Sequence, residues 1–147
     1  TSLIGVYIFY NLIYALAAYP IGRLSDRIGF KNIFLIGLLL FALVYIGMAM
    51  AHQLYLFFIL FFLYGIYAAA TESVAKAWIS NITDKKDTAT AIGTYTGFQS
   101  VCAMAASALA GWIWFAHGAE ATFLFSGLTT LLIIVYVLLI IPESIRQ

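Results

Sequence analysis

The chain has little of what a soluble domain uses to stay in water. Only 9% of its residues are charged, whereas 65% are hydrophobic, and its mean hydropathy is +1.03. A soluble domain carries about 25% charged residues, so this composition excludes that class and places the chain in a lipid bilayer. The net charge of +1 is too small to indicate binding of nucleic acid or of an acidic partner.

Cysteine, proline and histidine are also scarce. The single cysteine, Cys102, excludes an internal disulfide and argues against a cysteine metal site, so we interpret it as a small packing residue. Each of the two histidines, His52 and His117, falls in an expected turn with no nucleophile or metal ligand near it in the sequence. The sequence therefore predicts no enzyme active site, no metal and no cofactor.

What the chain does have is long apolar stretches. A helix needs about twenty apolar residues to cross a bilayer, and five stretches reach that length, at residues 3–21, 33–51, 54–80, 88–116 and 122–141. The predicted fold class is an all-α membrane protein with five transmembrane helices. Because five is an odd number and the chain starts without methionine, almost inside a helix, we expect a fragment of a six-helix unit that lacks its first member.

The basic residues predict an orientation. If the segment 22–32 lies in the cytoplasm, the basic residues outside the spans all fall on that side, namely Arg23, Arg27, Lys31, Lys85, Lys86 and Arg146. The positive-inside rule supports this topology. We therefore expect an integral protein of the cell (inner or plasma) membrane, with the segment 22–32 and the C-terminus in the cytoplasm.

The segment 22–32 gathers four charged residues and two glycines between two apolar stretches. We read it as a loop. Gly22 would let the first helix end close to a neighbour, and Gly29 would permit a tight reversal. Asp26 would accept hydrogen bonds from the free N–H groups at the start of another helix, and the helix that starts near Thr88 is the candidate within this chain. These contacts require the inner helix ends to be together, so they would stabilise an inward-closed state.

Polar side chains also lie inside the expected spans. Tyr7, Asn11 and Tyr14 recur at helical spacing in the first stretch, and Gln99 lies near the middle of the fourth. Two interpretations stay open for them, namely interhelical hydrogen bonding with packing, or the lining of a solute cavity. The fourth stretch carries a face of small residues, which we expect to pack against another helix: Gly93, Gly97, Ser100, Ala103, Ser107 and Gly111. The second and fifth stretches are apolar nearly all round, and we expect them to face lipid.

Glu72 and Lys76 stand four residues apart inside the third stretch, with the acid first, which is the favoured order for an intrahelical ion pair. Three roles stay open for this pair. It could belong to a gating ion-pair network near the inner surface, it could snorkel to the interface, or it could bind a substrate or a proton directly.

The residues Gly22-x-Leu24-Ser25-Asp26-Arg27-x-Gly29-x-Lys31 resemble the loop motif of the major facilitator superfamily, G-x-L-[SA]-D-R-x-G-[RK]-[RK]. That motif joins the second and third helices of each six-helix half, and Phe30 stands where it usually has a basic residue. Residues 64–72, Lys76-Ala77 and residues 88–93 are similar to the tenth and eleventh helices of such transporters, and Pro142-Glu143-Ser144 to the ending of a half. The resemblance implies helices eight to twelve, in the C-terminal half.

The resemblance also implies a function and a set of site residues. It implies secondary active transport of a small solute by alternating access, with the missing N-terminal half of the same transporter as the partner of this segment. The conformational loop would comprise Gly22, Arg23, Leu24, Asp26, Arg27, Gly29 and Lys31, and the possible cavity Tyr7, Asn11, Tyr14 and Gln99. The alternative is a non-transporting membrane helix bundle, receptor-like or structural, that keeps the fold.

Overall fold

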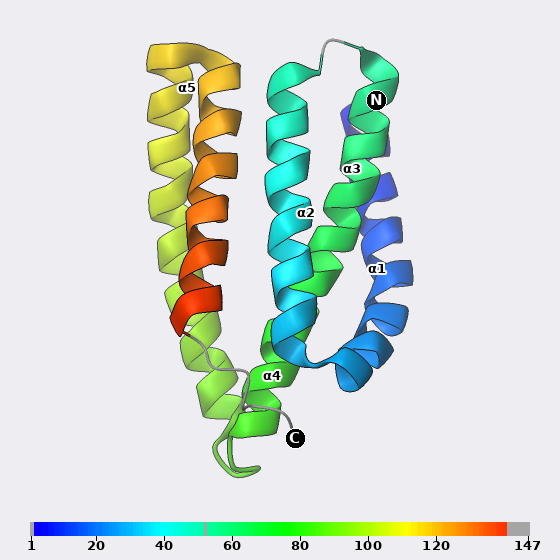
Figure 1. Cartoon of the computed structure of the whole chain (residues 1–147), viewed down its shortest axis with the longest axis vertical. Helices are drawn as coiled ribbons and strands as arrows, with labels where there is room; N and C mark the ends of the chain where they lie inside the picture. The colour runs from blue at the N-terminus through cyan, green and yellow to red at the C-terminus, as the bar shows by residue number, and fades with distance from the viewer. Residues whose placement is uncertain (1, 52, 141–147) are drawn as a thin grey trace.

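The computed structural model describes residues 2–51 and 53–140, and the chain folds into a bundle of helices (Figure 1). The helices follow the order α1 (Ser2–Ile28), α2 (Phe30–Met50), α3 (Leu54–Ala68), the π-helical turn η1 (Ala69–Ser73), α4 (Val74–Ile82) and α5 (Thr88–Ile140). No strand occurs in these two ranges, so the predicted all-α class is confirmed. The expectations about His52, the segment Pro142-Glu143-Ser144 and Arg146 concern positions outside the described residues.

Three helical segments are long and apolar enough to cross a membrane, namely Phe30–Met50, Tyr55–Ile82 and Thr88–Ile140. The second of these joins α3, η1 and α4 into one continuous helix of 28 residues. α1 is helical throughout the first expected stretch. The count of five spans stays a prediction, and the five stretches correspond in position to the helical segments of the structure.

α5 consists of two antiparallel arms. Gly118 has φ 87° and ψ 176°, which interrupts the helical conformation, and Figure 1 shows the two arms side by side on either side of this bend. A positive φ of this kind favours glycine because a Cβ atom would be strained there. The two arms match the stretches 88–116 and 122–141, and they are joined by a tight bend with almost no loop.

α2 is the central helix, because it contacts α1, α3, η1, α4 and α5. Its buried residues are Ile33, Gly37, Ala42, Val44 and Ala49. The second arm of α5 packs closely on it, since a Cβ atom placed on Gly127 would lie 2.8 Å from Cγ1 of Ile46. The sides that meet are therefore buried against each other, whereas the same helices keep exposed apolar side chains such as Leu39 and Leu132. That these exposed sides face lipid stays a prediction. The polarity of the sequence did not indicate which sides pack together, because the interface is built from small and apolar residues.

α1 and α3 approach each other closely at Gly65. A Cβ atom at this position would lie 2.9 Å from Cγ2 of Ile13 and 3.3 Å from the carbonyl oxygen of Tyr10. Only glycine permits such an approach without a shift of the neighbours. The contact brings the tyrosines of α1 next to those of α3.

The segment between the first two spans is not the extended loop that we expected. α1 continues through Pro20 to Ile28, and only Gly29 separates it from α2. Proline lacks the N–H group that an α-helix uses, and Figure 1 shows the last turns of α1 changing direction toward α2. Gly29 makes the reversal with φ 91° and ψ 147°, so its predicted role in a tight turn is confirmed.

Candidate functional site

Tyrosine side chains from three helices form one aromatic cluster. Tyr10 is at its centre on the α1 side, with ring centroids 6.5 Å from Tyr7, 6.4 Å from Tyr14 and 5.4 Å from Tyr64. The ring centroids of Tyr64 and Tyr67 on α3 are 5.3 Å apart. These distances fall in the range in which aromatic rings attract one another, so the cluster is a packed unit with one side on α1 and the other on α3.

α2 supplies the back of this tyrosine cluster. The Phe41 ring lies 4.7 Å from that of Tyr67 and 4.0 Å from that of Tyr45. The ring of Tyr45 lies 6.3 Å from that of Tyr64. These ring contacts pack Tyr64 against α2.

Glu72 lies in the π-helical turn η1, directly after the buried residues Ala69, Ala70 and Thr71. The Oγ1 atom of Thr71 donates to the carbonyl oxygen of Tyr67 at 3.0 Å, and the hydroxyl of Ser73 donates to the carbonyl oxygen of Ala69. Hydroxyl bonds to the carbonyl oxygen four residues back often bend a helix, and π-helical turns are frequent at functional sites. Thr71 is buried and Glu72 exposed, so the turn presents the carboxylate on an open side of the helix.

The turn η1 packs against α1 and α3, which places the carboxylate of Glu72 within electrostatic range of tyrosines from three helical segments. These are Tyr10 and Tyr14 on α1, Tyr64 and Tyr67 on α3, and Tyr95 on the first arm of α5. Glu72 is thus an acid close to the tyrosine cluster. The continuous helix Tyr55–Ile82 places it about 15 Å from the end of that helix at Ile82, at 1.5 Å per residue.

The residues predicted to line a cavity are accessible, although they do not all belong to one group. Tyr7 is 67% exposed, Asn11 and Gln99 are exposed, and Tyr14 is half-buried. The Nδ2 atom of Asn11 donates to the carbonyl oxygen of Tyr7 at 2.8 Å, so this donor is used inside its own helix. The structure brings Tyr7 and Tyr14 to the tyrosine cluster, and the cavity role of all four residues stays a prediction.

The small-residue face of α5 is open. No atom lies within 4 Å of a Cβ placed on Gly93, Gly97 or Gly111. The expected packing partner therefore does not come from the part of this chain that the structure describes. Gly22 is equally open, so its expected role in a close helix approach is wrong within this chain, and Cys102 is exposed on the same arm of α5.

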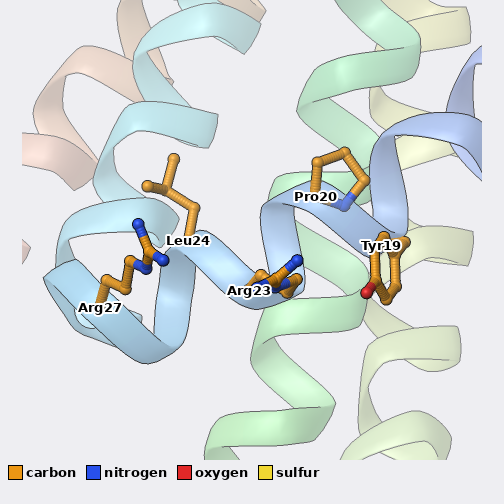
Figure 2. Close-up of a pocket in the computed structure, with 5 residues that line it drawn as sticks. All are labelled: Tyr19, Pro20, Arg23, Leu24 and Arg27. Atoms are coloured by element: carbon orange, nitrogen blue, oxygen red, sulfur yellow. The ribbon is translucent and has the colours of Figure 1, made fainter.

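The motif segment forms the last turns of α1. Ser25 is 2% exposed, and its hydroxyl donates to the carbonyl oxygen of Gly22 at 2.7 Å. On the exposed side of this segment, the Arg23 guanidinium lies 5.9 Å from the centroid of the Tyr19 ring. A shallow hollow of about 290 Å³ at this point is lined by Tyr19, Pro20, Arg23, Leu24 and Arg27, whose side chains are drawn in Figure 2.

Asp26 is exposed, and the helix start that we expected to receive it has other partners. The N–H groups of Asp87 and Thr88 donate to the carbonyl oxygen of Asp84 at 2.9 Å and 3.1 Å, and the Thr88 hydroxyl donates to the same oxygen. The N–H groups of Asp87 and Thr88 are therefore already paired within the turn before α5. The contact of Asp26 with a helix start, in this chain or in the missing half, stays a prediction.

Five tyrosines of the site were not singled out from the sequence as site residues, namely Tyr10, Tyr45, Tyr64, Tyr67 and Tyr95. The signal available was the abundance of tyrosine, ten residues in the chain. Helical periodicity places side chains on faces of one helix, but it does not say which faces of different helices meet. Glu72 was identified, and its tyrosine surroundings were missed.

The sequence model of the Major Facilitator Superfamily matches residues 1–147, which is the whole chain. The chain belongs to this superfamily. Together with the three helices able to span a bilayer, membership makes it part of an integral membrane protein of a transporter family. The recognition of the motif Gly22–Lys31 is confirmed at this level, whereas the assignment to helices eight to twelve stays a prediction.

Two relatives carry the same family name. The uncharacterized MFS-type transporter MJ1317 of Methanocaldococcus jannaschii is 33% identical over 129 residues, which cover 88% of this chain and 32% of the relative. The uncharacterized MFS-type transporter YqjV of Bacillus subtilis is 35% identical over 71 residues, covering 48% of this chain and 17% of the relative. The chain thus spans about a third or less of the relatives it matches, and no solved structure matches it.

The described residues contain no candidate metal site. Among residues 2–51 and 53–140, no three His, Cys, Asp or Glu side chains lie together in an arrangement that could hold a metal ion. His117 is exposed, with its ring 6.3 Å from that of Trp112. What the site can do chemically therefore follows from one carboxylate, tyrosine hydroxyls and aromatic faces.

Proposed function

We propose that this chain is one half of a secondary active transporter, which moves a small solute by alternating access. The observation that carries the proposal is the exposed carboxylate of Glu72, about 15 Å along the helix from its inner end and within electrostatic range of tyrosines of three helical segments. A charge at this depth costs at least about 2.5 kcal/mol unless it faces water or protein. Membership of a transporter superfamily supports the same reading.

The arrangement of polar and apolar surfaces also supports a division of labour. Tyr7, Asn11 and Gln99 are exposed at membrane depth on α1 and on the first arm of α5. In a complete carrier these surfaces would face the cavity between the two halves, and the N-terminal half would supply the opposite wall. The small-residue face of α5, which nothing in the described part of this chain covers, would pack against that wall.

The orientation belongs to the same proposal. With the end of α1 in the cytoplasm, Arg23 and Arg27 line a hollow at the inner surface, and Glu72 lies between that surface and the tyrosine cluster. Asp26 would hold a helix end of the other half when the inner side is closed. Opening toward the cytoplasm would break that contact.

Transport is tested with the intact protein, expressed from its complete gene and reconstituted into proteoliposomes. We expect a panel of small solutes to contain at least one that accumulates inside the vesicles when a proton gradient is imposed. If the folded protein moves none of them with or without a gradient, the alternative of a non-transporting helix bundle is favoured. Empty vesicles are the control.

The cavity residues are tested with the solute so identified. We expect Asn11→Ala and Gln99→Ala to raise the apparent KM for uptake by about three-fold to ten-fold, because each loses a hydrogen bond to solute worth about 1 kcal/mol. The amount of folded protein is measured in parallel. A loss of folded protein at an unchanged KM would assign both residues to helix packing instead.

A further inference from the structure

We propose that Glu72 and the tyrosine cluster bind the cationic group of an organic solute, with apolar groups of the solute against the tyrosine rings. The proposal rests on the proposed transport function and adds a substrate class to it. The site consists of Glu72, in a turn that packs against α1 and α3, and the tyrosines within electrostatic range of its carboxylate, namely Tyr10, Tyr14, Tyr64, Tyr67 and Tyr95.

The first step of the argument is charge. Glu72 supplies a negative charge that is exposed at membrane depth. The other described charge in the same helix is Lys76, one turn nearer the inner end and also exposed. An anionic solute would meet the carboxylate at short range and be repelled, whereas a cation would neutralise it, and this matters most where water is scarce.

The second step is the chemistry of the walls. The rings of Tyr10, Tyr14 and Tyr64 are linked by centroid distances of 6.4 Å and 5.4 Å, and Tyr14 is only half-buried. The face of an aromatic ring carries negative potential and attracts a cation within about 6 Å, most strongly when the cation is desolvated. The same rings offer apolar area to alkyl or aryl groups of the solute.

The third step is the scarcity of competing hydrogen-bond donors. A neutral polyhydroxylated solute needs several amide or charged partners, and Asn11 already uses one of its two Nδ2 N–H donors on the Tyr7 carbonyl oxygen. What the site presents is aromatic surface with one carboxylate, and an organic cation matches both.

The test uses tetraphenylphosphonium as a cationic probe and the intact protein in lipid nanodiscs, with binding to empty nanodiscs subtracted. We expect saturable binding to the wild type. Glu72→Gln should weaken it about ten-fold or more, because the carboxylate charge is lost. The matched control is Glu120→Gln, which removes an exposed acid near the bend at Gly118 and should leave binding unchanged.

The aromatic contribution is tested at Tyr14. We expect Tyr14→Phe to keep the affinity within about two-fold and Tyr14→Leu to weaken it about five-fold, because leucine removes the ring face. The proposal is overturned if the folded wild type shows no saturable binding, or if Glu72→Gln and Glu120→Gln bind the probe equally well.

A second measurement needs no variant and covers the case in which Glu72→Gln does not fold. Dicyclohexylcarbodiimide modifies carboxyl groups in apolar surroundings, and peptide mass spectrometry reports whether Glu72 has reacted. We expect tetraphenylphosphonium to protect Glu72, and the anion of the same shape, tetraphenylborate, to give no protection. Equal protection by both ions, or by neither, would contradict a cation site.

The two proposals fail in different ways. If the protein transports a solute in proteoliposomes but binds tetraphenylphosphonium without any dependence on Glu72, the cation site is wrong and the transport function stands. If the probe binds through Glu72 but no solute crosses the membrane, the site stands and transport is wrong.

Discussion

At the scale of single residues, backbone geometry and close contacts decide which positions matter. Gly29 has φ 91° and ψ 147°, a region that is essentially restricted to glycine. Gly22 lies seven positions earlier within α1, and a Cβ atom there would meet nothing within 4 Å. Both glycines belong to the same motif, yet the fold requires only Gly29.

This difference predicts that alanine changes the stability of the protein in opposite directions at Gly29 and Gly22. We expect Gly29→Ala to lower the free energy of unfolding of the intact protein by about 1–3 kcal/mol, through backbone strain alone, because a Cβ atom at Gly29 also meets open space. Gly22→Ala should leave stability unchanged or raise it by up to about 1 kcal/mol, because alanine favours the helix. Thermal unfolding in detergent measures both.

A third variant separates strain from simple loss of glycine. Gly29→Asn should be destabilised like Gly29→Ala, because asparagine tolerates the left-handed helical region near ψ of about +47° and not the ψ of 147° found here. Equal unfolding midpoints for wild type and Gly29→Ala would contradict the observed turn.

At the scale of elements, the position of the π-helical turn η1 depends on its packing against α2. A Cβ atom on Gly37 would lie 2.8 Å from Cγ2 of Thr71 and 3.1 Å from Cβ of Ala70, both in η1. Gly47, on the same helix, faces the end of the flexible Leu60 side chain at 2.9 Å. The same substitution therefore meets a rigid neighbour at one position and a movable one at the other.

We expect Gly37→Ala to displace η1 and with it Glu72, and to cost about 1–3 kcal/mol of stability as an overpacked contact. Gly47→Ala, its matched control, should cost less than about 1 kcal/mol, because Leu60 can adopt another rotamer. Unfolding measures the stability, and labelling of Glu72 by dicyclohexylcarbodiimide reports its position. If both variants unfold alike and label alike, Gly37 does not position the turn.

At the scale of the whole molecule, α2 holds α1, α3 and α5 together, while α1 and the first arm of α5 keep large exposed surfaces. A bundle whose polar groups remain uncovered at membrane depth is incomplete as a barrier. The exposed Asp26 near the end of α1 fits a contact with a partner outside this chain.

The predicted role of Asp26 is tested by access from the cytoplasm. After Cys102→Ser removes the exposed native thiol, a reporter cysteine at Thr90, exposed near the start of α5, is labelled with a polar maleimide. We expect Asp26→Asn to raise the labelling rate about three-fold to ten-fold, because the loss of a charge–dipole contact of about 1 kcal/mol favours the inward-open state.

The control for this experiment is Asp84→Asn, which removes another exposed acid before α5 and should leave the labelling rate unchanged. If Asp26→Asn labels at the wild-type rate while the protein still folds and inserts, Asp26 does not act as a clasp between helix ends.

Much of this architecture was predictable because it depends on local properties of the chain. The apolar stretches predicted the helices, and the glycine at position 29 predicted the reversal into α2. The conformation of residues 22–28 was predicted wrongly, because their charges indicated a loop although Arg23, Leu24 and Arg27 are good helix formers. The partner of Asp26 stays a prediction, although the carbonyl oxygen of Asp84 already accepts from the N–H groups of Asp87 and Thr88 at the start of α5.

By itself, the sequence determined that this protein lies in a membrane and where its helices run. It also showed that one helix contains an acid. Both follow from hydrophobic length and charge, which are local properties of the chain. Only the tertiary structure decided that α2 is central and that Glu72 lies within electrostatic range of tyrosines from α1, α3 and α5. These facts depend on which helix faces fit together, and Gly37, Gly65 and Gly127 set that fit by admitting particular neighbours. Such complementarity arises between distant segments, so no local pattern records it.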